Sequence, residues 1–250
     1  MNNCSLANLK RVLLTLSFTA MIIPGYSQES PEFDKIVTSA GVVEMHFIGH
    51  GSLMFKLNGF VIYIDPSRSS GKYDFLPKAD LILVTHEHGD HLDPALIGDL
   101  KKPETLLFCN QNSLSKIPWG MAMKADDRQE INNIIIEAVP AYNIVNESTP
   151  GHPFHPKGLG VGYILTIGGK RFYVAGDTEN TPEMKSLRNI DVAFLPMNLP
   201  YTMTPAMVAD AALAFKPKIL YPYHFGETDT SEIVKLLKDS GIEVRIRSLK

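Results

Sequence analysis

The sequence is poor in cysteine and has no excess of positive charge. Its 250 residues contain two cysteines, Cys4 and Cys109, and 24 Lys and Arg against 27 Asp and Glu, for a formal net charge of −3. So few cysteines exclude the disulfide framework of a small secreted scaffold. Without a basic cluster, nucleic acid is a poor candidate partner.

Long hydrophobic runs are also missing. The longest apolar segment, Val12–Ile23, follows Lys10 and Arg11 and is followed by small residues up to Ser27. It is shorter than the roughly 20 apolar residues of a membrane-spanning helix. A positive start, a short apolar run and small residues describe a secretory signal peptide. We expect residues 1–27 to be removed on export to the periplasm or the medium, leaving no stable membrane anchor; an uncleaved anchor is the alternative.

The remaining chain, residues 28–250, has the composition of one globular domain. The whole sequence is 44% hydrophobic and 20% charged, which suits a protein that buries a sizeable core. After a polar stretch to about Ala40, β-rich segments fill two halves that no linker separates. Strands are predicted at 42–48, 53–57, 60–64, 81–84, 106–109, 133–139, 163–167, 171–175, 192–195, 219–223 and 243–246, and helices at 94–101, 205–215 and 231–240. This pattern predicts an α/β sandwich.

Side chains that can bind metal are concentrated directly after the apolar strand 81–84. His86, His88, Asp90 and His91 fall within six positions of a chain that has eight histidines. Alternate residues of an extended segment point the same way, so His86 and His88 can hold one ion together. Asp90 and His91 can reach a second ion beside it. Imidazole and carboxylate suit Zn²⁺, Fe²⁺ or Mn²⁺, so this segment predicts a metal site rather than a solvated loop.

Two further candidate ligands also follow apolar strands. Asp177 comes after a hydrophobic segment and Gly176, and His224 comes directly after the strand 219–223. A strand end holds a side chain rigidly while leaving one face open to a ligand. The structural alternatives are a helix cap for Asp177 and a hydrogen-bonded, half-buried histidine for His224.

These segments resemble the metallo-β-lactamase superfamily. Thr85-His86-x-His88-x-Asp90-His91 is similar to its signature motif, and the resemblance extends over roughly residues 42 to 250. It is strongest to the branch that contains ascorbate-phosphate lactonases and related metal-dependent hydrolases, on the segments Ile48-Gly49-His50-Gly51-Ser52, Ile64-Asp65-Pro66, Val174-Ala175-Gly176-Asp177-Thr178 and Tyr221-Pro222-Tyr223-His224-Phe225-Gly226. The resemblance implies an αββα sandwich, two β-sheets flanked by helices. It also implies two divalent metal ions, with Zn favoured and Mn or Fe open, bridged by Asp177, with His224 on the second.

One position departs from the family pattern. The family usually supplies a histidine to the first metal where this sequence has Asn143. Asn143 is then either a weak ligand or an outer-shell donor, or a nearby histidine takes over that role. His152 and His155 are available, and we prefer His155 because its surroundings resemble an ordered loop over the site. His50 and Tyr201 are further candidates for the outer shell or the substrate pocket.

The function implied by the resemblance is metal-dependent hydrolysis of a small molecule. A metal-bridging hydroxide would attack an ester, lactone, amide or phosphoester bond. Asp90 would orient the water or pass a proton to the leaving group. The alternatives are a β-lactamase and a catalytically inactive metal-binding protein of the cell envelope, the latter kept open by Asn143.

Overall fold

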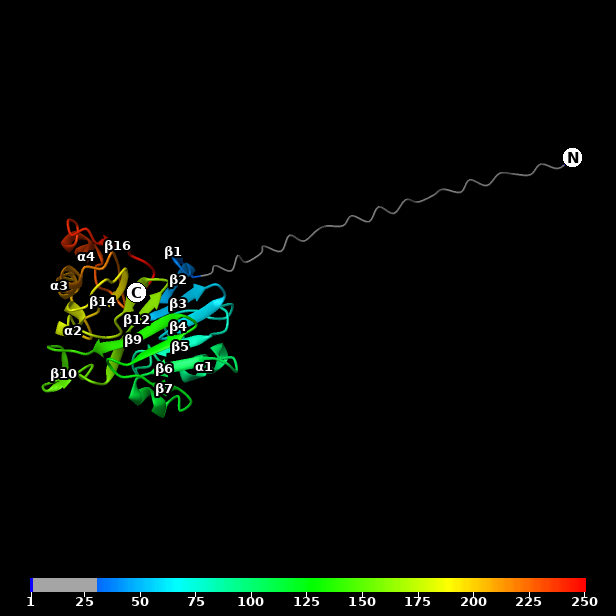
Figure 1. The fold of residues 1–250 in the computed structure, drawn as a ribbon, viewed down its shortest axis with the longest axis horizontal. Coiled ribbons are helices and arrows are strands. Elements are labelled where there is room, and N and C mark those ends of the chain that lie inside the picture. The colour runs from blue at the N-terminus through cyan, green and yellow to red at the C-terminus, as the bar shows by residue number, and fades with distance from the viewer. Residues whose placement is uncertain (2–30) are drawn as a thin grey trace.

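A computed structural model describes Met1 and residues 31–250 (Figure 1). Two seven-stranded mixed sheets face each other, and a few helices flank them, which confirms the predicted αββα sandwich. The predicted signal peptide, residues 1–27, lies outside the described residues. Within the described part of the chain, no helix is long and apolar enough to cross a membrane.

The first sheet is built in chain order. Its strands are β1 (Phe33–Thr38), β2 (Gly41–Gly49), β3 (Ser52–Leu57), β4 (Phe60–Ile64), β5 (Leu81–Val84), β6 (Leu106–Cys109) and β7 (Met121–Ala122). The first four pair antiparallel as a meander, and the pairs from β4 to β7 are parallel. Helix α1 (Pro94–Leu100) connects β5 to β6, and the short 3₁₀ helix η1 (Gln111–Ser115) follows β6.

The second sheet has the strand order β16-β15-β14-β13-β12-β9-β8. Its strands are β8 (Arg128–Ile131), β9 (Ile134–Ala141), β12 (Gly160–Ile167), β13 (Lys170–Val174), β14 (Val192–Pro196), β15 (Ile219–Tyr223) and β16 (Glu243–Val244). A separate hairpin, β10 (Glu147–Thr149) with β11 (His152–Pro153), lies between β9 and β12 in the chain. Helices α2 (Pro182–Lys185), α3 (Pro205–Phe215) and α4 (Ser231–Leu236) belong to this half.

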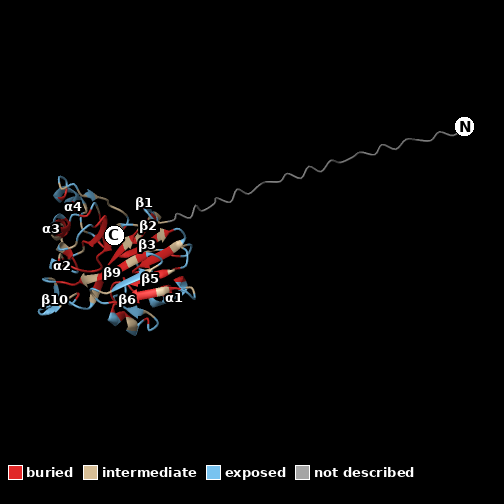
Figure 2. Ribbon diagram, in the orientation of Figure 1, coloured by how far each residue is buried: buried red, intermediate tan, exposed pale blue. Residues whose placement is uncertain are grey.

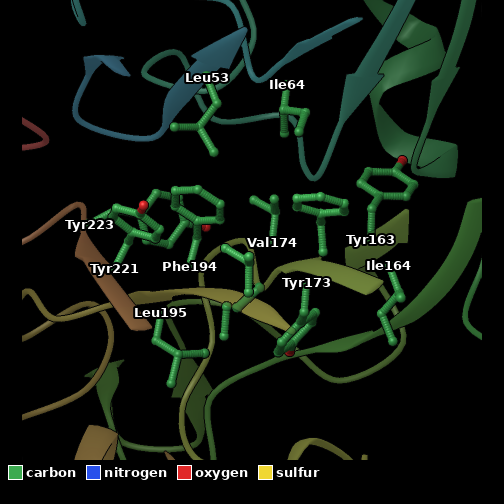
Figure 3. Packing of buried hydrophobic residues seen from close by; sticks show 14 of the residues in the cluster. Leu53, Ile64, Tyr163, Ile164, Tyr173, Val174, Phe194, Leu195, Tyr221 and Tyr223 are labelled. Atoms are coloured by element: carbon green, nitrogen blue, oxygen red, sulfur yellow. The ribbon is translucent and has the colours of Figure 1, made fainter. Parts of the chain in front are cut away.

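The main core lies between the two sheets, where the strands are largely buried (Figure 2). Phe194, Tyr221 and Tyr223 of the second sheet point toward Leu53 and Ile64 of the first (Figure 3). A second apolar cluster packs α1 on the outer face of the first sheet.

The position of strand β5 between two apolar clusters explains why its sequence is uniformly apolar. Leu81 and Leu83 face the core between the sheets, whereas Ile82 and Val84 face the cluster beneath α1. Successive residues of a strand point to opposite faces, so a strand covered on both sides has no polar positions. The loop that follows β5 is therefore anchored by a rigid, doubly covered strand.

The ends of the fold differ from the sequence-based expectation. The polar stretch before Ala40 contains β1, an edge strand that pairs with β2 through residues such as Phe33 opposite His46. Its exposed positions weaken the apolar pattern by which strands are recognised. The helix predicted at 231–240 ends at Leu236. The last strand is limited to Glu243–Val244, because it lies at the edge of the sheet and pairs only with β15.

Strand β1 is tied to the C-terminal segment by the carboxylate of Asp34. Arg247 Nη2 donates to both of its oxygens at 3.0 and 2.9 Å, Arg245 Nη1 donates at 3.2 Å, and the Tyr221 hydroxyl donates as well. Burial would raise the pKa of Asp34, but these hydrogen bonds and the arginine charges lower it. A carboxyl group with a lowered pKa contributes stability above its unfolded pKa that is lost as the pH falls.

We therefore expect Asp34→Asn to lower the free energy of unfolding at pH 7 by about 2–3 kcal/mol, the scale of hydrogen bonds to charged groups. The difference from the parent should shrink as the pH falls below about 4, because the unfolded chain then takes up a proton at Asp34 before the folded chain does. Urea unfolding at pH 7 and pH 3 measures this. An equal difference at both pH values would show that the charge of Asp34 is not responsible.

Candidate metal centre

Loops from both sheets place the predicted ligands together. The segment between β5 and α1 carries His86, His88, Asp90 and His91. Asp177 follows β13, His224 follows β15, His155 follows β11, and His50 follows β2. Three groups have ligand atoms that all lie within 4.8 Å of one another: His86, His88 and His155; His50, Asp90, His91 and His224; and His86, His91 and Asp177. The first two groups are two adjacent ligand clusters. The third group connects them, because it contains His86 of the first cluster, His91 of the second, and Asp177.

Asp177 lies between the two clusters. Its Oδ2 is 3.3 Å from His155 Nε2 and 3.9 Å from His86 Nε2, on the side of the first cluster. Toward the second cluster, Oδ1 is 3.4 Å from His91 Nε2 and Oδ2 is 3.5 Å from His224 Nε2. One buried carboxylate therefore faces four imidazoles that come from three loops.

The inner ring nitrogens of this centre lack protein partners. Nε2 of His86, His91, His155 and His224, and Oδ1 of Asp177, are buried without a hydrogen bond within residues 31–250. Buried polar atoms are almost always paired, so a group of unpaired atoms pointing at one another needs an explanation. Nitrogen and carboxylate donors in this arrangement match what a divalent transition metal requires. The residues present therefore fit metal.

The pKa shifts of His86, His155 and Asp177 favour the forms that bind metal. Burial, followed by the charge of His91, holds the pKa of His86 well below its usual value, and burial also lowers the pKa of His155. Burial would raise the pKa of Asp177, but the charges of His224 and His91 hold it well below its usual range. Neutral imidazole and ionised carboxylate are the forms that bind a cation. His91 differs: burial would lower its pKa, but the carboxylates of Asp177 and Asp65 raise it well above its usual value, so His91 must release a proton when it binds metal.

Asp90 is ionised for a related reason and is more accessible. Its Oδ2 lies 3.2 Å from His50 Nε2 and 3.5 Å from His224 Nε2. Burial works against ionisation, but these neighbours lower the pKa of Asp90. Its side chain is 41% exposed, whereas that of Asp177 is 4% exposed. Both carboxylates line the cleft, and Asp90 is the one that is open to solvent.

His91 is held by a fully buried second carboxylate. Asp65 Oδ2 lies 2.8 Å from His91 Nδ1, and Asp65 also accepts hydrogen bonds from the backbone N–H and the hydroxyl of Thr85, each at 2.7 Å. Burial raises the pKa of Asp65, and these partners oppose that rise. Gly51 leaves room for the ring, because a Cβ there would lie 2.7 Å from His91 Cε1. The second ring nitrogen of His91 is thereby directed toward Asp177.

His155 is held in a comparable way by Asn143. Asn143 Oδ1 accepts hydrogen bonds from the backbone N–H of His155 at 2.7 Å and from its Nδ1 at 2.8 Å. The backbone N–H of Asn143 donates to the His155 carbonyl at 2.8 Å. A hydrogen bond at Nδ1 leaves Nε2 free for a metal, as in most metal-bound histidines.

Glu179 is a residue that the sequence analysis missed. It is fully buried, and its carboxylate accepts the backbone N–H groups of Ile144, Val145 and Asn146 at 2.8, 2.9 and 2.7 Å. Asn143 Nδ2 also donates to it at 3.3 Å. Glu179 thus holds the loop that orients His155. The sequence offered one sign of its role, its position two residues after the candidate ligand Asp177. An acidic residue in a loop is normally exposed to solvent, so the sequence did not indicate that Glu179 is buried.

The remaining candidates are placed as follows. His50 joins the second cluster, with its ring centroid 3.7 Å from that of His224. Tyr201 is 45% exposed and lines a cleft beside the cluster. His152 is exposed on β11 and belongs to none of the clusters. Thr181, not Asp177, caps the helix that follows, which removes the structural alternative for Asp177.

Comparison with known proteins identifies the family. Residues 44–224 match the family described as Beta-lactamase superfamily domain. A UPF0173 metal-dependent hydrolase from Archaeoglobus fulgidus is 32% identical over 225 residues, covering 83% of this chain and 96% of that protein. Another UPF0173 metal-dependent hydrolase, from Methanopyrus kandleri, is 28% identical and covers 80% of this chain and 94% of its own.

Solved structures agree with this. The crystal structure of a candidate metal-dependent hydrolase from Parabacteroides distasonis is 48% identical, with a TM-score of 0.84 over 88% of this chain and 99% of that one. The metallo-β-lactamase fold protein YhfI from Bacillus subtilis, 13% identical, has the same fold, with a TM-score of 0.64 over 87% of this chain and 96% of its own. The chain therefore belongs to the metallo-β-lactamase superfamily. Within it, the chain is a metal-dependent hydrolase of the UPF0173 group.

Proposed function

We propose that the chain binds two divalent metal ions and uses them to hydrolyse an ester, lactone, amide or phosphoester bond of a small molecule. The observation that carries this proposal is the position of Asp177, whose single buried carboxylate faces both ligand clusters. The first metal would be held by His86, His88 and His155, and the second by Asp90, His91 and His224, with Asp177 between them.

Zn²⁺ is the ion that suits this donor set best, with Mn²⁺ and Fe²⁺ as alternatives. Metal held here would lower the pKa of a bound water toward neutrality and polarise the carbonyl or phosphoryl oxygen of the substrate. His50 adjoins the second cluster, and its Nε2 fixes the orientation of Asp90 Oδ2.

Asp90 is the residue that we assign to proton transfer. Its carboxylate lines the cleft and is 41% exposed, so it can orient the attacking water and pass a proton to the leaving group. No serine or cysteine nucleophile is needed. Cys109, for example, is buried in the cluster under α1, away from the ligand clusters.

Two alternatives stay open, and each has a distinguishing result. A β-lactamase would open the four-membered ring of a penicillin or cephalosporin, and an inactive envelope protein would bind metal without hydrolysing any probe. We also propose that the substrate is a small molecule. The signal-like residues 1–27 support a further proposal, that the protein is exported.

The test of the metal assignment begins with elemental analysis of the purified protein, for which we expect two ions per chain. His155→Ala should reduce this to about one, because the first cluster loses one of its three histidines. Asn143→Ala should keep the second ion and weaken binding of the first by about 10- to 100-fold, as expected for an outer-shell partner.

His152→Ala is the matched control, since His152 lies in the same loop and outside the clusters. One ion or fewer in the parent, or a metal content unaffected by His155→Ala, would contradict the assignment. A screen of ester, lactone, amide, phosphoester and β-lactam probes with the metal-loaded protein then tests the activity.

A further inference from the structure

The cleft beside the metal centre has a composition that bears on the substrate. Its volume is about 370 Å³, which suits a small molecule. Besides the candidate metal ligands and His50, it is lined by Phe154, Asn198 and Tyr201. Among the lining residues, all within the described part of the chain, there is no lysine or arginine.

The absence of basic residues disfavours a phosphorylated substrate. Phosphate groups are commonly recognised by the paired donors of arginine or by lysine. The lysines on adjoining loops are engaged elsewhere: Lys116 Nζ donates to the Glu87 carbonyl at 2.6 Å, and Lys157 Nζ to Glu183 at 2.9 Å. Apart from bound metal, the charged groups that line the cleft are the carboxylates of Asp90 and Asp177, so an anionic group would find no cationic side chain there and would depend on the metal alone.

Asn198 offers a hydrogen-bonding group that the fold does not use. Its backbone carbonyl accepts from the N–H groups of Tyr201 and Thr202 at 3.0 and 2.8 Å, and its own N–H donates to the Thr202 hydroxyl at 2.8 Å. These bonds form the turn after β14. The carboxamide of Asn198 makes no hydrogen bond within residues 31–250, although it lines the cleft.

The carboxamide lies close to the second ligand cluster. It sits against the backbone of Gly226, two residues after His224, and a Cβ at Gly226 would be 3.1 Å from Asn198 Oδ1. Gly226 has a φ of +48°, a conformation that glycine adopts without strain. The turn and this glycine together hold a free amide donor at the edge of the metal centre.

Phe154 and Tyr201 form an apolar wall on the same cleft. Their ring centroids are 5.0 Å apart, with the rings edge to face at 74°. Tyr201 is also fixed through its carbonyl, which accepts from Asn143 Nδ2 at 2.8 Å. A smaller adjoining cavity continues the apolar surface with Pro156 and Leu159. This wall can bury a hydrocarbon group of the substrate.

We propose, on the basis of the function proposed above, that the substrate is an uncharged acyl compound, an ester, lactone or amide, whose reacting carbonyl oxygen is bound by the Asn198 carboxamide and whose apolar part packs on Phe154 and Tyr201. When water adds to the carbonyl carbon, its oxygen gains negative charge, and Asn198 Nδ2 donates a hydrogen bond to it. The acyl C–O or C–N bond then breaks, and the leaving oxygen or nitrogen receives a proton of the water through Asp90. An ester or amide gives a carboxylic acid and an alcohol or amine, and a lactone gives one hydroxy acid.

The experiment uses the metal-loaded full chain with p-nitrophenyl acetate, p-nitrophenyl butyrate and p-nitrophenyl phosphate. We expect hydrolysis of both acyl esters, little of the phosphate, and a preference for butyrate of about tenfold from the added methylenes. Asn198→Ala should lower kcat on both esters by about 100- to 1000-fold, the usual effect of removing a donor to a developing oxyanion. Its KM, metal content and thermal midpoint should stay unchanged.

Tyr201→Ala tests the apolar wall separately, and it should raise KM for butyrate more than for acetate. Gln129→Ala, which removes an exposed carboxamide on the edge strand β8, is the matched control. Unchanged kcat in Asn198→Ala would overturn the role of Asn198. Hydrolysis of the phosphate alone would overturn the acyl substrate while the hydrolase function stands. No hydrolysis of any probe by protein with two bound ions would overturn both.

Discussion

Asp177→Asn is expected to lower the affinity for divalent metal by on the order of 100-fold. Loss of a residue that only orients a ligand lowers metal affinity by about 10- to 100-fold, and the loss at Asp177 should reach at least the upper end of that range. The physical reason is that one carboxylate faces both clusters, so the substitution removes a negative charge from beside both proposed metal positions. Asparagine keeps the size of the side chain and removes the charge. Titration with Zn²⁺, followed by calorimetry, should show both binding steps weakened, in contrast to the single step affected by His155→Ala.

Asp210→Asn is the matched control for this change. Asp210 is exposed on α3 and binds only Lys185 and Asn180 in the described structure. The Asp210→Asn protein should therefore bind two metal ions as the parent does. Loss of one binding step in Asp177→Asn, with the other step unchanged, would place Asp177 on a single metal. The proposal of a shared carboxylate between two ions would then be wrong.

Asp65→Ala should have the largest effect on stability. Asp65 is fully buried and accepts from three donors: Nδ1 of His91 and the backbone N–H and hydroxyl of Thr85. Its removal leaves the His91 Nδ1 and the Thr85 N–H without a partner, and the Thr85 hydroxyl with His86 Nδ1 alone. Breaking a buried charged pair costs about 3–5 kcal/mol of unfolding free energy. For a domain of this size that corresponds to a fall in Tm of roughly 6–20 °C. Urea unfolding of the metal-free protein measures it without a contribution from bound ions.

Asp65→Asn distinguishes the hydrogen bonds from the charge. The amide oxygen can still accept one of the three donors, so this variant should lose less stability than Asp65→Ala. Both variants should also bind the second metal more weakly, because the His91 ring loses the partner that orients it. A loss of less than about 1 kcal/mol in Asp65→Ala would mean that the buried group contributes no more than one ordinary hydrogen bond.

The sequence by itself determined the order of most elements and the segments that carry the ligands. The helix predicted at 205–215 and the strand at 219–223 coincide with α3 and β15. The uniformly apolar sequence before His86 is typical of a strand covered on both faces, and β5 is such a strand. These features depend on residues that are close in the chain, where periodicity, capping and turn residues act directly.

Tertiary structure decided which side chains meet and what holds them. His155 joins His86 and His88 because the segment after β9 folds back, so that Asn143 binds a residue 12 positions further on. Glu179 secures that loop across a separation of 33 to 36 residues, and β1 exists as a strand because β2 and two distant arginines hold it. Such contacts join residues far apart in the chain, so their energies appear only once the two sheets have packed together.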